Sequence, residues 1–404
     1  MSQQPEKEND GQQPEEAKQP ELLDTDGGMT PEAAKKKREK TIMVIMIVLA
    51  AVMSLAAAVC LLYNRWVQKP SLPPAIDAPD PAASLLPGET PTPAEEDDSS
   101  LQPKVSGERR SADIYTILVV GVDQVSSSTD TMMLVTYDVT NQQATVMSLP
   151  RDTLVNVRSG SVYTRLNSVY ALYGRGEKGV EALMREVSEL VGFTPDFHVF
   201  VDWELVGEMV DAIGGVWYDV PYRMYYKDPA QGLYIDVEKG YQLLDGDLAM
   251  QVVRWRKNNM GVSSGGGTGS DLNRLQVQQG FLKAVLRQTL QIQNVTRIGQ
   301  LAELFNSRVE SELTLENMIW FASLAVFGGL VADDVEFITM PIYGYGDYVY
   351  PNQSGLLELI NEKLNPYTDQ VTINELDLIR VNGDGSLSSS TGVLADPRAA
   401  APRQ

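Results

Sequence analysis

The chain has 404 residues, of which 54 are acidic and 33 are basic, and it contains one cysteine, Cys60, and one histidine, His198. A zinc site needs several Cys or His ligands, and a Ser-His-Asp or Cys-His site needs a histidine beside its nucleophile. These counts therefore argue against both kinds of site. The net charge of −21 also argues against nucleic acid as the partner, because surfaces that bind nucleic acid are basic.

The N-terminal part of the chain predicts a membrane anchor between two segments without a folded core. Residues 41–63 contain neither a charge nor a proline, and about 20 apolar residues span the hydrocarbon core of a bilayer as a helix. A secretory signal peptide is the alternative, but its apolar stretch is shorter, about 7–15 residues. Residues 1–40 predict a disordered tail, and residues 64–112 predict an acidic, Pro-rich spacer.

Basic residues on the two sides of this span predict its orientation. Residues 35–40 are almost all Lys or Arg, whereas only Arg65 and Lys69 follow closely after the span. Under the positive-inside rule, the N-terminus lies in the cytoplasm and everything after the span lies outside. The sequence therefore predicts a single-pass protein of the cell membrane with an extracellular domain.

Residues 113–380 predict one folded ectodomain, and residues 381–404, rich in Gly, Ser, Ala and Pro, predict a disordered C-terminal tail. Strands are expected at 114–123, 132–139, 143–149, 198–203, 214–220 and 335–340. Helices are expected at 178–191, 204–213, 246–253, 272–291, 296–307, 315–324 and 355–363. Interleaved strands and helices favour an α/β fold, an α-β-α sandwich. A short turn joins the second and third strands, so the sheet should be mixed.

The candidate chemistry is carried by arginines and carboxylates. Arginines recur in short polar motifs, at Arg151, Arg165, Arg254, Arg256 and Arg274. In an acidic chain, arginines brought together indicate a polyanionic ligand such as pyrophosphate, which guanidinium groups bind in bidentate fashion. Asp123 and Asp130 flank the loop after the first strand, where an α/β sheet commonly binds its ligand. Two carboxylates with phosphate oxygens suit Mg²⁺.

Several of these residues also have a purely structural interpretation. Asp152 could pair with Arg151 on the surface, Asp130 could be a turn or cap residue, and Asp271 could cap the helix that it precedes. The glycine-rich loop 258–270 lacks the G-K-[ST] ending of a nucleotide-binding P-loop. It predicts either a mobile lid beside the arginines or a tolerated insertion.

Six sequence blocks together resemble the LytR-CpsA-Psr (LCP) family. In chain order they are GVD…STDTMMLVTYD, VMSLPRDT, RLNSVYALYG, DAIGGVWYDV, KGYQLLDGDLAMQVVRWR and SDLNRLQVQQ. The resemblance is close over residues 116–283 and looser to residue 378. It implies an enzyme on the outer face of the cytoplasmic membrane that transfers a glycopolymer, such as wall teichoic acid or capsular polysaccharide, from polyprenyl pyrophosphate to peptidoglycan.

The resemblance also implies roles for single residues. Asp123 and Asp130 match the aspartates that bind Mg²⁺ or Mn²⁺. The residues expected to bind pyrophosphate are Arg151, Arg254, Arg256, Arg274, Gln278 and Asn167. Those expected to act in catalysis are Arg151 and Arg254, which absorb charge on the leaving phosphate, and Asp152 or Asp271 as the general base.

Two positions depart from the family pattern. The family usually carries arginine at the positions of Ser128 and Val277. Their loss leaves a second function open: a non-catalytic or regulatory cell-envelope protein that binds polyprenyl lipid with the same fold. His198, inside a predicted strand, is expected to be a packing residue.

Overall fold

The computed structural model describes residues 67–73, 107–122, 129–158, 162–230, 232–267, 269–291 and 297–400, together with Met46 and Met53. The predicted span at 41–63 lies outside these residues, apart from the two methionines. Within the described part of the chain, no helix is long and apolar enough to cross a membrane. The unit from Val67 onward is described below.

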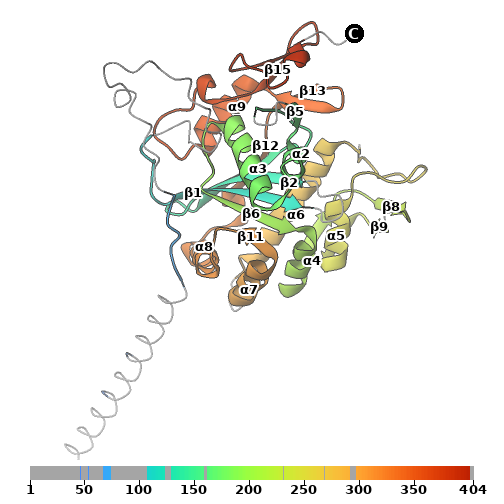
Figure 1. Ribbon diagram of the computed structural model, residues 1–404. Helices are drawn as coiled ribbons and strands as arrows, with labels where there is room; N and C mark the ends of the chain where they lie inside the picture. Colours follow the sequence, from blue (N-terminus) through green and yellow to red (C-terminus); the bar gives the residue numbers. More distant parts are fainter. Residues whose placement is uncertain are drawn as a thin grey trace, which may run out of the picture. The chain divides into compact units, whose positions relative to one another are not determined.

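A six-stranded mixed sheet forms the centre of this unit (Figure 1). In spatial order its strands are β11 (Val309–Ser311), β6 (Phe197–Asp202), β1 (Ile114–Val122), β2 (Thr129–Asp138), β3 (Gln143–Leu149) and β12 (Val335–Thr339). β1, β3, β6 and β12 run in one direction, and β2 and β11 run in the other. The hairpin from β2 to β3 makes the sheet mixed, as predicted. The carboxyl ends of β1, β3, β6 and β12 therefore meet at one edge, where β2 begins.

Helices cover both faces of the sheet, which confirms the three-layer prediction (Figure 1). One face packs against α2 (Leu166–Leu172), α3 (Gly176–Val191) and α9 (Gln353–Leu359). The other face packs against α6 (Asp271–Thr289), α7 (Ile298–Arg308) and α8 (Leu315–Gly328). Apolar residues at helical spacing, as in α3, explain why these segments form helices that bury one side.

The two faces of the sheet are not equally well covered. On the α3 side, the central strands contribute fully buried side chains, such as Leu118 and Leu134. On the α8 side, Ile117 pairs with Val135 and Val119 pairs with Met133, and all four are only half-buried. The helices α6, α7 and α8 therefore leave an apolar strip in the middle of the sheet partly uncovered. We call these four residues the apolar strip.

A second apolar cluster lies beside the sheet. It joins α4 (Trp203–Ala212), α5 (Gly246–Arg254) and α6 to two hairpin-like sheets. These sheets pair β7 (Val216–Val220) with β10 (Gly240–Leu244), and β8 (Met224–Asp228) with β9 (Leu233–Val237). Asp202 and Asp245 cap α4 and α5 by accepting backbone N–H groups, the usual role of aspartate before a helix.

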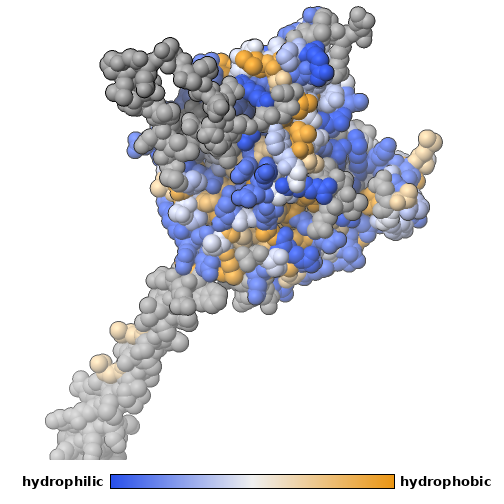
Figure 2. All heavy atoms as spheres, viewed as in Figure 1, coloured by the Kyte–Doolittle hydropathy of each residue, from blue (hydrophilic) through white to orange (hydrophobic). Residues whose placement is uncertain are grey.

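Three further two-stranded sheets lie near the α2 side. They pair β4 (Leu154–Val157) with β5 (Val162–Arg165), β13 (Ile342–Tyr345) with β14 (Tyr348–Pro351), and β15 (Ile379–Val381) with β16 (Leu387–Ser389). On the face shown in Figure 2, hydrophilic residues dominate and hydrophobic residues form small scattered groups.

The C-terminal segment differs from the predicted disordered tail. β16 lies beyond residue 381, and Leu387 is buried against Leu154. Further on, the backbone N–H of Ala395 donates to Asn156 Oδ1 at 2.8 Å. The Gly- and Ser-rich composition gives no periodicity, so its order comes from contacts with residues more than 200 positions earlier.

His198 lies on β6, as predicted, and packs against Phe200 with ring centroids 5.6 Å apart. Its Nδ1 also lies 2.5 Å from Glu312 Oε1. Burial alone would raise the pKa of Glu312, but its hydrogen bonds with His198 outweigh burial and lower that pKa. The histidine therefore also ties β6 to the segment before α8.

Candidate active site

Charged side chains meet at the sheet edge where β2 begins and β3 ends. Asp130 is the second residue of β2, and Arg151 follows β3 by two residues. Arg151 Nη1 donates to Asp130 Oδ1 at 2.9 Å, and both side chains are half-buried. The structure thus brings together two residues that the sequence predicted to share a site.

A second arginine extends this pair into a network. Asp152 Oδ1 lies 3.1 Å from Arg165 Nε, and its Oδ2 lies 3.6 Å from Arg151 Nε. The guanidinium of Arg165 also lies over the Tyr348 ring, 4.7 Å from its centroid. We call Asp130, Arg151, Asp152 and Arg165 the charge network. In it, the Asp152 carboxylate lies between two guanidinium groups and attracts both.

The sequence marks Arg165 as an arginine in a polar motif, but it gives no role to Arg165 in the site. The sequence feature that could have assigned Arg165 to the site is its position in the RLN block, two residues before Asn167. The backbone of Asn167 contacts residues of and next to the charge network. Its N–H donates to Arg151 O at 3.1 Å, and its carbonyl accepts from Thr129 Oγ1 at 3.3 Å. These two hydrogen bonds connect Arg151, two residues after β3, to the first residue of β2, Thr129.

A second group of predicted residues lies where α5 ends. Arg254 is the last residue of α5, and Trp255 is extended and fully buried. Two positions apart on a helix, Arg254 and Arg256 would point in different directions. Because the helix stops between them, both are exposed at the same helix end. Trp255 anchors this end through a hydrogen bond of 2.8 Å from its ring nitrogen to Asn258 Oδ1.

The start of α6 supplies the remaining predicted residues. Ser270 caps the helix by accepting the N–H of Asn273, so Asp271 is its first residue and not its cap. Arg274 and Gln278 are buried one and two turns further on. Gln278 Nε2 donates to Val253 O at 3.1 Å, and no donor in the described part of the chain reaches its Oε1.

Contacts of α6 with the sheet show that both groups lie at the same edge. Gln279 Nε2 donates to Ser148 Oγ at 2.9 Å, near the end of β3, and to Thr339 Oγ1 at the end of β12. Lys283 pairs with Asp333, before β12 begins, at 3.0 Å. α6 therefore runs opposite to β3 and β12. Its first residue lies about 12 Å before Gln279, beyond the carboxyl ends of these strands and on the side of Arg151.

The predicted metal site is described only in part. Asp123 lies outside the described residues, as does Ser128. Among the described residues, no three His, Cys, Asp or Glu side chains cluster as metal ligands. A Mg²⁺ site commonly uses one or two carboxylates, with water and phosphate oxygens completing the shell. Asp130, a half-buried carboxylate at the sheet edge, fits that donor set.

The family usually has an arginine at position 277, and its replacement by valine suggests the loss of one phosphate-binding cation. The structure shows a different role for this position. Its side chain is buried in the apolar cluster of α5, α6 and β7. Position 277 therefore faces the core of this chain and does not contribute to the charged edge.

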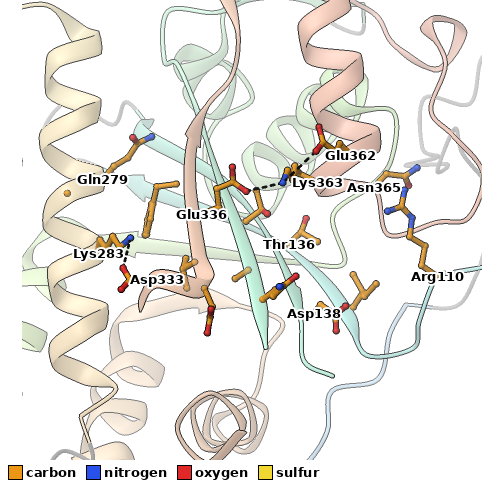
Figure 3. A pocket seen from close by; sticks show the side chains of 18 of the residues that line it. Arg110, Thr136, Asp138, Gln279, Lys283, Asp333, Glu336, Glu362, Lys363 and Asn365 are labelled. Carbon is orange, nitrogen blue, oxygen red and sulfur yellow. Dashed lines mark ion pairs between the residues drawn. The ribbon is translucent and has the colours of Figure 1, made fainter. Parts of the chain in front are cut away.

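A separate cleft of about 950 Å³ lies at the opposite edge of the sheet (Figure 3). It is lined by the beginnings of β3 and β12, the end of β2 and part of α6. Two of its cations are paired, Lys363 with Glu336 at 3.3 Å and Lys283 with Asp333 at 3.0 Å. The third, Arg110, donates to the backbone carbonyl groups of Asn361 and Tyr367. The cleft is therefore distinct from the charge network.

The fold and this site define an α/β protein with arginines gathered at one edge of its central sheet, and comparison with known proteins gives its family. The chain belongs to the LytR_cpsA_psr family, whose model matches residues 88–365. It is 24% identical over 252 residues to the polyisoprenyl-teichoic acid–peptidoglycan teichoic acid transferase TagV of Bacillus subtilis, covering 60% of each chain. It is 27% identical over 272 residues to an uncharacterised protein of Staphylococcus aureus, covering 63% of this chain and 62% of that one. The chain thus spans about three fifths of the length of these relatives.

The regulatory protein MsrR of Staphylococcus aureus is 26% identical over 253 residues, which is 62% of this chain and 71% of MsrR. Among solved structures, Bacillus subtilis TagV superimposes with a TM-score of 0.52 at 21% identity, covering 64% of this chain and 99% of that one. A Streptococcus agalactiae protein gives a TM-score of 0.53 at 19% identity, covering 66% and 94%. At these identities the structures support the fold alone.

Proposed function

We propose that this protein is a phosphotransferase that attaches a polyprenyl-pyrophosphate-linked glycopolymer, of the wall teichoic acid or capsular type, to peptidoglycan. The observation that carries the proposal is the charge network at the sheet edge, beside the helix ends that bear Arg254 and Arg274, in a member of this family. The membrane span predicted from the sequence at residues 41–63, with the N-terminus in the cytoplasm, would put the site outside the cell, where peptidoglycan is found.

The apolar strip supports a lipid-linked donor. Ile117, Val119, Met133 and Val135 are large apolar side chains in the two central strands, yet they are only half-buried. Interiors of globular proteins are normally close-packed. A polyprenyl chain lying between the sheet and the helices α6, α7 and α8 would cover this surface, with its pyrophosphate at the sheet edge.

In the proposed reaction, an acceptor hydroxyl oxygen attacks the phosphorus on the glycan side of the pyrophosphate. A new P–O bond to peptidoglycan forms, and the P–O bond to the lipid phosphate breaks, so polyprenyl phosphate leaves. The guanidinium groups of Arg151, Arg165 and Arg254 stabilise the negative charge on the leaving phosphate. Asp271, at the start of α6, remains the candidate to accept the hydroxyl proton, because Asp152 is engaged between two arginines.

The proposal includes a divalent cation at Asp130, together with Asp123. When bound there, Mg²⁺ or Mn²⁺ would polarise the phosphoryl oxygens. Arg151 holds Asp130 in place through the 2.9 Å contact, so this arginine serves the carboxylate as well as the phosphate.

A second candidate function is a non-catalytic polyprenyl-lipid-binding protein that regulates cell-envelope assembly. Two observations favour it: Asp130 already pairs with an arginine, and one relative bears the name regulatory protein MsrR. Such a protein would bind the donor without releasing polyprenyl phosphate.

The test uses the full-length chain in detergent micelles with a polyprenyl-pyrophosphate-linked glycan, Mg²⁺ and peptidoglycan. Release of polyprenyl phosphate and labelling of peptidoglycan are measured for the wild type and for Arg254→Ala. The matched control is Arg308→Ala, because Arg308 also ends a helix, α7, but pairs with Glu208 of α4 and is not part of the charge network.

We expect Arg254→Ala to lower turnover by about a hundredfold or more, and Arg308→Ala to leave it unchanged. Equal activity in the two variants would reject the role of Arg254. A wild-type protein that binds the donor but never turns it over would reject the transferase and favour the regulatory function.

A further inference from the structure

The small sheet of β7 and β10 has a buried face and an exposed face with unusual side chains. Residues 216, 218 and 220 of β7 point inward, and Trp217 and Asp219 point outward. On β10, Tyr241 and Leu243 point outward. Leu243 lies opposite Trp217, and Tyr241 lies opposite Asp219. We call these four outward residues the Trp217 face.

Three of the four residues are large and apolar, although they face solvent. Trp217 is 48% exposed, Tyr241 is 70% exposed and Leu243 is 45% exposed. The rings of Trp217 and Tyr241 stack on each other, with centroids 5.3 Å apart and planes 18° apart. The outward face of such a sheet is normally polar, and clustered exposed apolar side chains mark a contact surface.

This face is firmly connected to the proposed active site. Tyr218, between Trp217 and Asp219, donates its hydroxyl to Val277 O at 3.3 Å, and Val277 precedes Gln278. Burial raises the pKa of Tyr218 to about 12, so the hydroxyl stays protonated and can donate. Gly280 allows this approach, since a Cβ there would lie 3.1 Å from the Tyr218 oxygen. The sheet therefore has a fixed position on α6, the helix that carries Arg274 and Gln278.

The charges around the Trp217 face limit what it can bind. The exposed ionisable residues in segments 211–219 and 238–247 are Asp211, Asp219, Glu238, Asp245, Asp247 and one cation, Lys239. A second cation, Arg297, reaches this region by donating to Ala212 O at 2.9 Å, so five acidic residues face two basic ones. An acidic border repels a polyanionic glycopolymer and an anionic lipid surface. It does not repel an uncharged sugar ring.

The side chains suit a sugar ring in their chemistry. The C–H groups of a pyranose carry slight positive charge, and the face of an aromatic ring carries slight negative charge. A carboxylate beside the ring, here Asp219, can accept hydrogen bonds from sugar hydroxyls. Trp217 and Tyr241 each keep one ring face that the other does not cover.

We infer that the Trp217 face binds the amino-sugar backbone of the peptidoglycan acceptor and presents it to the charged edge. This inference rests on the proposed function for the identity of the acceptor. It makes Trp217 and Tyr241 acceptor-binding residues, separate from the donor-binding arginines.

The test measures co-sedimentation of the full-length chain, in detergent micelles, with peptidoglycan sacculi stripped of attached glycopolymer. The variant is Trp217→Ala/Tyr241→Ala, and the control is Phe327→Ala, an aromatic residue on α8 that is about as exposed as Tyr241. We expect the double variant to bind about tenfold more weakly, as is typical for removal of interface aromatics. Phe327→Ala should bind like the wild type, and Trp217→Tyr should retain most of the binding.

Four results bear on the inference. Equal binding of the wild type and the double variant to sacculi would overturn the inference. Loss of binding to phosphatidylglycerol vesicles, with sacculus binding intact, would make the face a membrane contact and overturn it as well. If the inference holds, the double variant raises the KM for sacculi with little change in kcat. Slow hydrolysis of the donor in the absence of sacculi, with water as the attacking nucleophile, is unchanged. Trp217-dependent sacculus binding by a protein that shows no turnover would reject the proposed function and keep this inference.

Discussion

The hydrogen bond from Gln278 to Val253 links the two helix ends of the site, and its removal is the sharpest test of how the arginines are positioned. The last carbonyl groups of a helix have no partner inside the helix. For Val253, which precedes Arg254, the partner is Gln278 Nε2 at 3.1 Å. A leucine at position 278 fills a similar volume but cannot donate.

The cost of Gln278→Leu follows from this contact. A buried acceptor that loses its donor costs about 1–3 kcal/mol. A buried leucine side chain stabilises the fold more than a buried amide does, and this gain offsets about 1 kcal/mol of the lost unfolding free energy. We therefore expect a net loss of up to about 2 kcal/mol in unfolding free energy. The end of α5 also loosens, and misplacement of a positioning group by about 1 Å can cost a hundredfold in rate.

The assay compares Gln278→Leu with Gln279→Leu. Gln279 is the adjacent amide and makes three hydrogen bonds to β3 and β12, away from α5. Both variants should lose stability in denaturant unfolding. Only Gln278→Leu should lose tenfold or more of its release of polyprenyl phosphate per folded molecule. An equal loss of turnover in the two variants would refute the idea that Gln278 positions Arg254.

Three further predictions test other parts of the molecule. Truncation after residue 382 removes Leu387 and two hydrogen-bond partners of Asn156, so the unfolding free energy should fall by about 2–4 kcal/mol; an unchanged melting temperature would show that the tail is not ordered. Below pH 4.5, the ordinary pKa of a glutamate, the unfolding free energy of Glu312→Gln should fall less steeply with decreasing pH than that of the wild type. Since the folded-state pKa of Glu312 is lowered, its contribution is complete above 4.5 and is lost as the pH falls through the folded value; parallel pH profiles of unfolding would contradict this. Arg165→Met should lower the rate of donor turnover by about tenfold or more with little change in stability, and normal turnover would remove Arg165 from the site.

The sequence predicts the central sheet and its helices well, because these segments are long and periodic. The strand at 114–123 and the helix at 178–191 coincide closely with β1 and α3. The short hairpins are different. β8, for example, depends on Asn258, whose side chain accepts the N–H of Tyr225 at 2.8 Å. No local pattern reveals a contact between residues 33 positions apart.

The site was predictable only through the order of the motifs. Nothing in the spacing of Asp130 and Arg151 shows that their side chains meet. Their approach follows from the register of β2 and β3, which is set by the sheet. Arg165 was missed because its contact with Asp152 depends on the β4–β5 hairpin, which pairs Leu154 with Arg165.

The unequal covering of the sheet has a consequence for how this protein can change during evolution. Close packing makes the α3 side intolerant, because a cavity at Leu118 or Leu134 would cost several kcal/mol. The half-buried strip around Val119 and Met133 carries less of the folding energy. Substitutions there should be tolerated as long as they stay apolar. Under the proposed function, variation on that side could therefore change which length or saturation of polyprenyl chain is accepted, without a large loss of folding stability.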